Sequence, residues 1–157
     1  MKTLVILMAI LFMFSCCTAS CTKGDETTPA QNNDVRNNNL SKSKMKITIG
    51  TAVFTATLYD NQSANAFRAK LPLSINMTEL NGNEKYYDFA NSLPTNASVG
   101  GNIKVGDLTL YGNKTLVLFY KNFSTSFSYT KLGYVDNPTG FATALGNGNA
   151  VVKFEYN

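Results

Sequence analysis

The sequence predicts a mainly β protein, a small closed β-barrel of about eight strands with two short helices. Along residues 44–157, short segments rich in β-branched and aromatic residues alternate with glycine and asparagine turns, as in all-β folds. Residues 116–120 (LVLFY) are apolar throughout and bounded by turn residues, which is typical of a strand buried on both faces. Only two short segments show a helical pattern, so a parallel sheet covered by helices is not expected.

Composition bounds the domain count and the chemistry. The 157-residue chain is 44% hydrophobic, which supports one globular domain with its own core, predicted at residues 44–157. The absence of histidine excludes Ser-His-Asp and Cys-His catalysis and removes the commonest metal ligand. We therefore expect no metal site and no cofactor. The net charge of +4 comes from scattered lysines rather than a basic patch, so no nucleic-acid partner is predicted.

The N-terminus predicts a secretory signal peptide over residues 1–20. Lys2 precedes an apolar run, LVILMAILFMF, that is too short to span a bilayer and is followed by small residues. The sequence Thr-Ala-Ser before Cys21 resembles the lipobox of bacterial lipoproteins, so Cys21 is the predicted lipidated residue. Cys16 and Cys17 remain alternatives, and so does an ordinary signal peptide cut near Ser20.

Residues 21–43 predict a lipidated cysteine followed by a disordered tether. This segment is Asn-rich and polar, and it cannot bury enough apolar surface to offset its ordering entropy. Its first residues, TKGDE, resemble the export signal of Bacteroidetes-type lipoproteins. No cysteine follows Cys21, so no disulfide is expected in the domain. We expect an exported protein, anchored by its lipid to the bacterial outer membrane and facing the periplasm or the cell exterior.

The first half of the predicted domain contains a hairpin, a helix and a strand pair. Residues 45–50 and 51–59 alternate apolar and polar side chains around a glycine turn, which predicts the hairpin. Residues 64–69 predict a short helix because apolar side chains recur at helical spacing before Pro72. Strands are predicted at residues 73–78 and 84–90, on either side of an Asn-Gly-Asn turn, and residues 92–102 are predicted to form a loop.

The second half predicts four strands and a second helix. Residues 103–105 form a short strand, and residues 107–111, 116–120 and 131–135 are the next three strands. Asn137 is the predicted N-cap of a helix with Pro138 at its first position and Gly146 beyond its end. Residues 150–156 (AVVKFEY) are the closing strand.

This order of elements resembles that of the cyclophilins over about residues 44–157. Residues 63–69 (SANAFRA) are similar to the first helix of that family, and residues 115–120 lie where the family has its buried strand. Residues 132–135, followed by a helix from Pro138, are similar to the family's next strand and second helix. The compact form is closer still to the minimal bacterial cyclophilin-like domains of largely unassigned function. The resemblance implies a cyclophilin-like β-barrel.

The chain departs from the residues on which cyclophilin prolyl isomerisation relies, which are an arginine, a glutamine, a histidine and aromatic side chains. Val117 occupies the apparent glutamine position, and Phe119 retains an aromatic side chain. The strand that would carry the arginine, residues 73–78, has no basic residue. Arg68 matches a helix arginine of the family that is not catalytic. We therefore predict no catalytic residue.

These observations predict a non-catalytic binding or accessory module for a peptide segment or a small ligand. The predicted binding face consists of Ser74, Asn76, Phe119, Phe127 and Tyr129. One alternative is a peptidyl-prolyl isomerase with an altered active site. Another is an accessory domain of redox proteins, since compact relatives can occur beside flavodoxin-like domains.

Three carboxylates near the Asn-Gly-Asn turn suggest a weak site for a hard cation. Glu79 and Glu84 flank the turn, and Asp88 follows one strand later. The simpler interpretation is that the three side chains are solvated on the surface, and this is our expectation.

Overall fold

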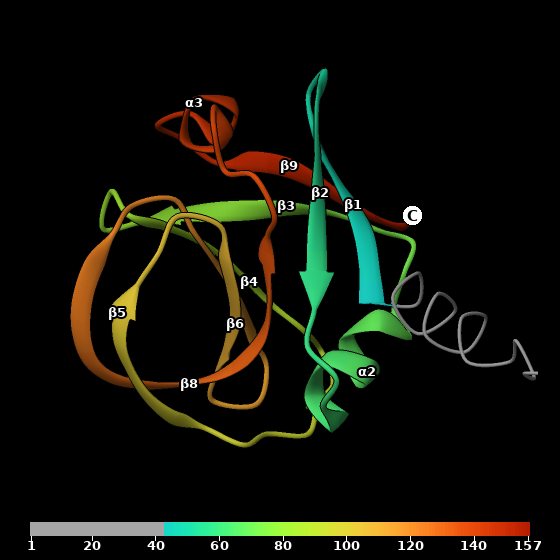
Figure 1. Cartoon of the computed structure of the whole chain (residues 1–157), viewed down its shortest axis with the longest axis vertical. Coiled ribbons are helices and arrows are strands. Elements are labelled where there is room, and N and C mark those ends of the chain that lie inside the picture. The colour runs from blue at the N-terminus through green and yellow to red at the C-terminus, as the bar shows by residue number, and fades with distance from the viewer. Residues whose placement is uncertain (1–42) are drawn as a thin grey trace, which may run out of the picture. The chain divides into compact units, whose positions relative to one another are not determined.

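The computed structural model describes residues 43–157 (Figure 1). The predicted signal peptide, the lipidated Cys21 and the tether up to residue 42 lie outside these described residues. Within the described part, no helix has the length and apolar character needed to cross a bilayer.

The described residues form nine strands and two helices, in the order ββαββββββαβ. The first half contains β1 (Lys44–Ile49), β2 (Ala52–Leu58), α2 (Gln62–Arg68), β3 (Leu73–Leu80) and β4 (Glu84–Asp88). The second half contains β5 (Ser98–Ile103), β6 (Asp107–Tyr111), β7 (Thr115–Phe119), β8 (Phe123–Val135), α3 (Phe141–Leu145) and β9 (Ala150–Tyr156).

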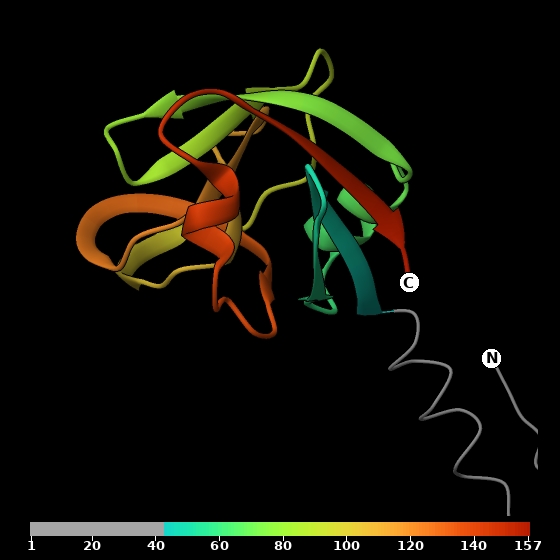
Figure 2. The same cartoon turned by 90° about the horizontal axis from the view of Figure 1, so that it is seen from above.

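Eight strands close into a ring in the order β2-β1-β9-β3-β4-β7-β6-β8. The ring closes because Ala56, Thr57 and Leu58 of β2 pair antiparallel with the last three residues of β8. Figure 2 shows the neighbouring strands β3 and β9 running side by side across one side of the ring. The prediction of a small closed, mainly β domain of about eight strands with two short helices is therefore confirmed.

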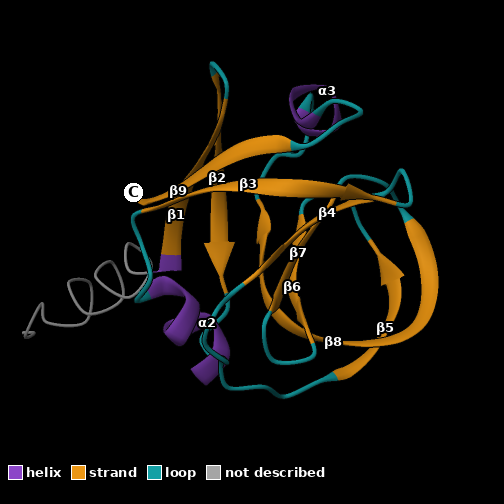
Figure 3. Ribbon diagram, turned by 180° about the vertical axis from the view of Figure 1, so that it is seen from behind, coloured by secondary structure: helices purple, strands orange, loops and turns teal. Residues whose placement is uncertain are grey.

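Strand β8 is long enough to pair with three other strands. Its last residues close the ring on β2, its middle pairs with β6, and its first half pairs with β5, which lies outside the ring. Figures 1 and 3 show β5 and the first half of β8 bowing together away from the ring. We call this pair of segments the outer arm, residues 98–103 and 123–129. It covers part of the outer surface of the ring.

The interior of the ring is the main hydrophobic core. Leu108 and Leu110 of β6 and Leu116 and Leu118 of β7 are fully buried there, as the alternation of side chains along each strand requires. Helix α2 contributes Phe67, whose ring meets Phe154 edge to face at 5.6 Å. The prediction that residues 116–120 form a strand buried on both faces is confirmed, since Val117 and Phe119 lie in a second cluster outside the ring.

The predicted loop at residues 92–102 was wrong in its second half, because Ser98–Ile103 forms β5. The glycine pair Gly100-Gly101 suggests a turn, but Gly100 serves packing instead. A Cβ at this position would lie 2.9 Å from Thr125 Cγ2 and 3.0 Å from Tyr129 Cδ2. The glycine therefore allows β5 to approach β8 closely, which no local sequence pattern reveals.

The predicted start of the second helix was also wrong. Helix α3 begins at Phe141 rather than Pro138, and Gly140 is its N-cap, with φ of 79°. Asn137 does not cap the helix; its side-chain oxygen accepts a hydrogen bond from the Thr139 N–H at 3.1 Å. Asparagine forms such local turns as readily as it forms helix caps, so the same residue suits either structure.

One end of the ring is closed around an ion pair between a buried lysine and a partly exposed glutamate. Lys85 of β4 is fully buried and pairs with Glu79 of β3. Its ammonium group also donates to the carbonyl oxygens of Gly146 at 3.0 Å and Gly148 at 2.6 Å, which fastens the loop after α3 to the ring. The Tyr120 hydroxyl donates to Glu79 at 2.6 Å.

The pKa values of these groups follow from burial and pairing. Burial acts against the charge of Glu79, but hydrogen bonds from Lys85 and Tyr120 and the lysine charge lower its pKa below the ordinary value. Burial, together with the hydrogen bond to Glu79, raises the pKa of Tyr120 to about 12. Glu79 is therefore a charged structural partner of Lys85 and not the solvated surface carboxylate that the sequence suggested.

Candidate functional site

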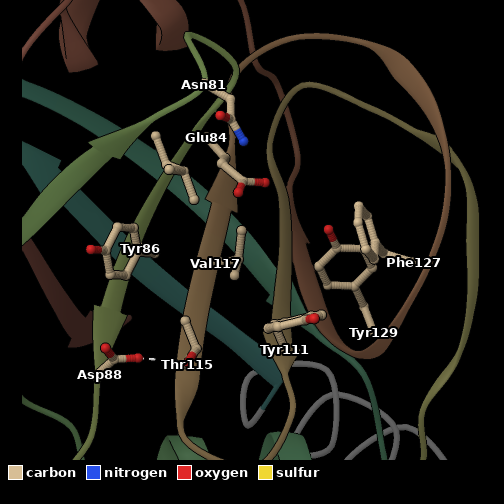
Figure 4. A pocket seen from close by; sticks show the side chains of 10 residues that line it. Asn81, Glu84, Tyr86, Asp88, Tyr111, Thr115, Val117, Phe127 and Tyr129 are labelled. Atoms are coloured by element: carbon tan, nitrogen blue, oxygen red, sulfur yellow. Dashed lines mark hydrogen bonds between the residues drawn. The ribbon is translucent and has the colours of Figure 1, made fainter.

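A pocket of about 300 Å³ lies on the outer surface of the ring, between strands β4, β7 and β6 and the outer arm (Figure 4). We call it the outer pocket. It is lined by Leu80, Asn81, Glu84, Tyr86, Asp88, Tyr111, Thr115, Val117, Phe127 and Tyr129.

The alternation of side chains along β4 supplies one wall of the outer pocket. Glu84, Tyr86 and Asp88 are two residues apart and therefore point to the same face of the strand. The residues between them point the other way, so that Lys85 lies in the closed end of the ring and Tyr87 packs against the main core. One five-residue strand thus carries a binding wall on one face and structural groups on the other.

Antiparallel register brings the other walls into place. Tyr86 lies opposite Val117, and Asp88 lies opposite Thr115, whose hydroxyl donates to the Asp88 carboxylate at 2.6 Å (Figure 4). On β6, Tyr111 lies opposite Thr115 on one side and Tyr129 of β8 on the other. With Leu80 at the end of β3, five strands therefore contribute to one pocket.

Aromatic rings form the side of the pocket nearest the outer arm. Tyr111 meets Tyr129 at a ring-centre distance of 5.7 Å and Phe127 at 6.3 Å. Tyr129 is nearly buried because its ring also meets Phe119 edge to face at 5.4 Å. Phe127 is 62% exposed, so it offers a large apolar surface at the mouth of the pocket.

Glu84 is the unusual polar group of the outer pocket. Its side chain is only 8% exposed, and its carboxylate points into the pocket (Figure 4). Among the residues that the structure describes, no donor makes a hydrogen bond or an ion pair with it. Burial, and then the negative charge of Glu79, raise the pKa of Glu84 above its ordinary value. The expectation that Glu84 is solvated on the surface was therefore wrong.

The described residues contain no group of three or more histidine, cysteine, aspartate or glutamate side chains that could hold a metal ion. Glu79 and Glu84 are separated by the pleat of the strand pair, since Lys85 lies opposite Glu79 and Glu84 lies opposite Leu80. The two carboxylates therefore face different sides of the sheet.

The structure brings together three of the five residues predicted to form the binding face. Phe127 and Tyr129 line the outer pocket, and Phe119 packs beneath Tyr129. Ser74 and Asn76 lie on β3, opposite Lys153 and Val151 of β9, and do not belong to the pocket lining. The reason is the register of β3, which pairs with β4 only over its last three residues.

Sequence reasoning missed Glu84 and Tyr111 as members of the site. Glu84, Tyr86 and Asp88 share a face once β4 is assigned, so period-2 alternation was a usable signal. It did not distinguish a pocket wall from an ordinary solvated face. Tyr111 offered no local signal, because its place depends on its partners in β7 and β8.

No basic side chain is found among the residues that line the outer pocket. Arg68 is the one arginine of the described chain, and it lies at the end of α2 with its guanidinium 5.7 Å from the centre of the Tyr156 ring. Val117, in the position that resembles the cyclophilin glutamine, is part of the pocket floor.

Comparison with known proteins points to one family. A model described as "Cyclophilin-like family" matches residues 47–155. Among solved structures, a hypothetical protein from Archaeoglobus fulgidus, determined in solution, is similar with a TM-score of 0.54 and 13% sequence identity. The similarity covers 73% of this chain and 95% of that protein, and at this identity it supports the fold alone. No curated protein sequence gives a significant match.

Proposed function

Because the chain belongs to the cyclophilin-like family, we propose that it is a binding or accessory module that holds a peptide segment or a small ligand in the outer pocket without catalysing a reaction. The observation that carries this proposal is the lining of the outer pocket, which combines aromatic side chains with a buried carboxylate and contains no basic donor. A concave, largely apolar site with a few polar groups is the usual form of a ligand site.

We propose a non-catalytic role because the lining of the outer pocket contains no basic donor. Rotation about a peptide bond has a barrier of about 18–20 kcal/mol. An enzyme lowers this barrier mainly by placing a donor where charge develops in the twisted amide. The cyclophilin arginine supplies this donor, whereas here Arg68 is held beside Tyr156 and does not line the pocket.

The alternative, a prolyl isomerase with an altered site, is favoured by one observation. Burial and the negative charge of Glu79 raise the pKa of Glu84, which favours its protonated form, and a protonated carboxyl group can donate a hydrogen bond into the pocket. Such an enzyme would lose its activity as the pH rises through the pKa of Glu84.

A prolyl isomerase assay on the purified full-length protein separates the two functions. We expect no acceleration of a proline tetrapeptide at any pH between about 5 and 8. Acceleration that cyclosporin abolishes, or that Glu84→Gln removes, would replace the binding module with the enzyme. A cyclophilin tested in the same buffer serves as the positive control.

We also propose that the domain is exported and anchored by a lipid on Cys21. The support is the N-terminal sequence, in which a short apolar run and small residues precede this cysteine. An acyl chain would hold the domain at a bacterial outer membrane, facing the periplasm or the cell exterior.

Metabolic labelling with a fatty-acid analogue tests the anchor. We expect the wild-type protein to incorporate the label in a bacterial host and Cys21→Ser to lose it almost completely. Cys16→Ser and Cys17→Ser are the matched controls and should remain labelled. Label retained in Cys21→Ser would refute the assignment, and loss in one of the controls would move it to that cysteine.

A further inference from the structure

We propose that the outer pocket binds a protonated amine, with the Glu84 carboxylate as its counter-charge and the rings of Tyr86, Tyr111 and Tyr129 around it. This inference rests on the proposed binding role and names the chemical class of the ligand.

Glu84 is the first argument. A carboxylate on a largely buried residue is costly when no protein group pairs with it, because it has lost part of its water and gained no compensating donor. Native proteins therefore pair buried charges or use them at functional sites. Glu84 is only 8% exposed and is aimed into an open pocket rather than into the protein (Figure 4). A cation entering this pocket would supply the missing partner.

The residues that the structure describes do not supply that cation. The ion pairs of the described chain use other carboxylates, joining Lys85 to Glu79, Lys44 to Asp136, and Lys46 and Lys153 to Glu155.

Lys121 lies at the turn beside the pocket, where its ammonium group would be 3.9 Å from a Cβ at Gly82. It is exposed and makes no ion pair with Glu84. Lys121 is therefore the competitor that an experiment must exclude.

The surroundings of Glu84 favour positive charge. The charge of Glu79, on the other face of the strand pair, acts on Glu84 and raises its pKa. The charge of Glu84 acts in turn on the Tyr129 hydroxyl, whose pKa is raised first by burial and then by this charge. Asp88 provides a second carboxylate on the same wall, about 13 Å along the strand. No basic side chain lines the pocket, and its charged lining residues are the two carboxylates Glu84 and Asp88.

The aromatic rings and the volume of the outer pocket indicate the size and the apolar part of the ligand. The face of an aromatic ring attracts a cation, most strongly where water is excluded. Tyr111, Tyr129 and Phe127 form a continuous aromatic side at ring-centre distances of 5.7 and 6.3 Å. A volume of about 300 Å³ lies at the lower end of the range for ligand sites, so it suits an amine on a short apolar chain. A small free amine and the lysine side chain of a peptide both have this chemistry.

The test compares n-butylamine, which copies the end of a lysine side chain, with the neutral n-butanol. Binding is followed by amide NMR shifts of the full-length protein, against a blank titration in the same detergent. We expect the amine to bind about tenfold or more tightly than the alcohol, and Glu84→Gln to abolish this difference. Asp60→Asn, which removes an exposed carboxylate outside the pocket, is the matched control and should leave the preference unchanged.

The pH dependence of amine binding and the variant Lys121→Met test whether binding depends on the Glu84 carboxylate. Butylamine remains protonated up to a pH near 10, as lysine does, so its affinity should rise with pH as Glu84 loses its proton. Lys121→Met should bind the amine at least as well as the wild type. Equal affinity for amine and alcohol, or an unchanged amine affinity in folded Glu84→Gln, would overturn the proposal. Thermal unfolding of Glu84→Gln, expected at or above the wild-type midpoint, verifies its fold.

A blocked Ala-Lys-Ala peptide and its norleucine analogue distinguish the two sources of the amine. If the lysine peptide binds more tightly than butylamine, the ligand is a peptide. If the lysine peptide binds more weakly than butylamine, the ligand is a free amine. Both results support the proposal if the norleucine peptide binds poorly. A failure of the amine proposal can be distinguished from a failure of the proposed binding role. Isomerase activity would overturn the binding module, whereas equal binding of amine and alcohol would leave that module standing and refute only the amine.

Discussion

Replacing Lys85 with methionine is expected to destabilise the domain by about 3–5 kcal/mol, the usual cost of removing one partner from a buried ion pair. The lysine is fully buried, and its ammonium group serves Glu79 together with the carbonyl oxygens of Gly146 and Gly148. Methionine fills a similar volume but donates no hydrogen bond. Three acceptors therefore lose their partner, and the loop after α3 is released from the end of the ring.

Chemical denaturation followed by circular dichroism measures this loss. The double variant Lys85→Met with Glu79→Gln should be less destabilised than the sum of the two single variants, because it contains no uncompensated charge. Lys114→Met, which changes an exposed lysine, is the control and should cost far less. Additive single effects would show that Lys85 and Glu79 do not act as a pair.

The acid dependence of stability provides a second check on the same pair. The folded-state pKa of Glu79 lies below its unfolded value, so the pair stabilises the fold at pH values above the unfolded pKa. This contribution is lost as the pH falls through the folded pKa. The difference in stability between wild type and Lys85→Met should therefore narrow in acid.

Gly133→Ala is expected to cost about 3 kcal/mol through overpacking at the seam where the ring closes. A Cβ at Gly133 would overlap the carbonyl oxygen of Thr57 and lie 3.0 Å from the Cα of Leu58. Both neighbours are backbone atoms of β2, so no side chain can turn away to make room. The methyl group can be accommodated only if β8 moves away from β2, where three residue pairs hold the ring closed.

Urea denaturation and amide hydrogen exchange test this expectation. Gly148→Ala is the matched control, because a Cβ there meets nothing within 4 Å, and it should be close to wild type. In Gly133→Ala, exchange should accelerate most for the amides of Thr57 and Tyr134, which face each other across the seam. Equal stability of the two alanine variants would mean that the seam tolerates a wider strand spacing.

Strands with strong alternation and clear turns were predicted from the sequence almost to the residue. β6 and β9 have the predicted bounds, and the hairpin of β1 and β2 forms around its glycine turn. These elements depend on local properties, namely the period of the side chains and the dihedral preferences of turn residues. β5 and the first half of β8 were missed because Gly100 and the Ser/Thr-rich residues before Tyr129 acquire their strand structure only by pairing with each other.

The residues of the candidate site were also predicted only in part from the sequence. Phe127 and Tyr129 were predicted as members of the binding face, and both line the outer pocket. Ser74 and Asn76 were grouped with them on resemblance, but the register of β3 against β9 directs them elsewhere. Register is a relation between distant segments, and a single strand does not encode it.

By itself, the sequence determined the fold class, the absence of histidine chemistry, and the strands whose hydrophobic period and turns are local properties of the chain. Only the tertiary structure decided the surroundings of the neighbouring side chains of Glu84 and Lys85. Both are charged side chains after a turn, yet one is paired inside the ring and the other stands unpaired in the outer pocket. The physical reason is the pleat of β4, which sends adjacent side chains to opposite faces whose surroundings are built by strands distant in the sequence.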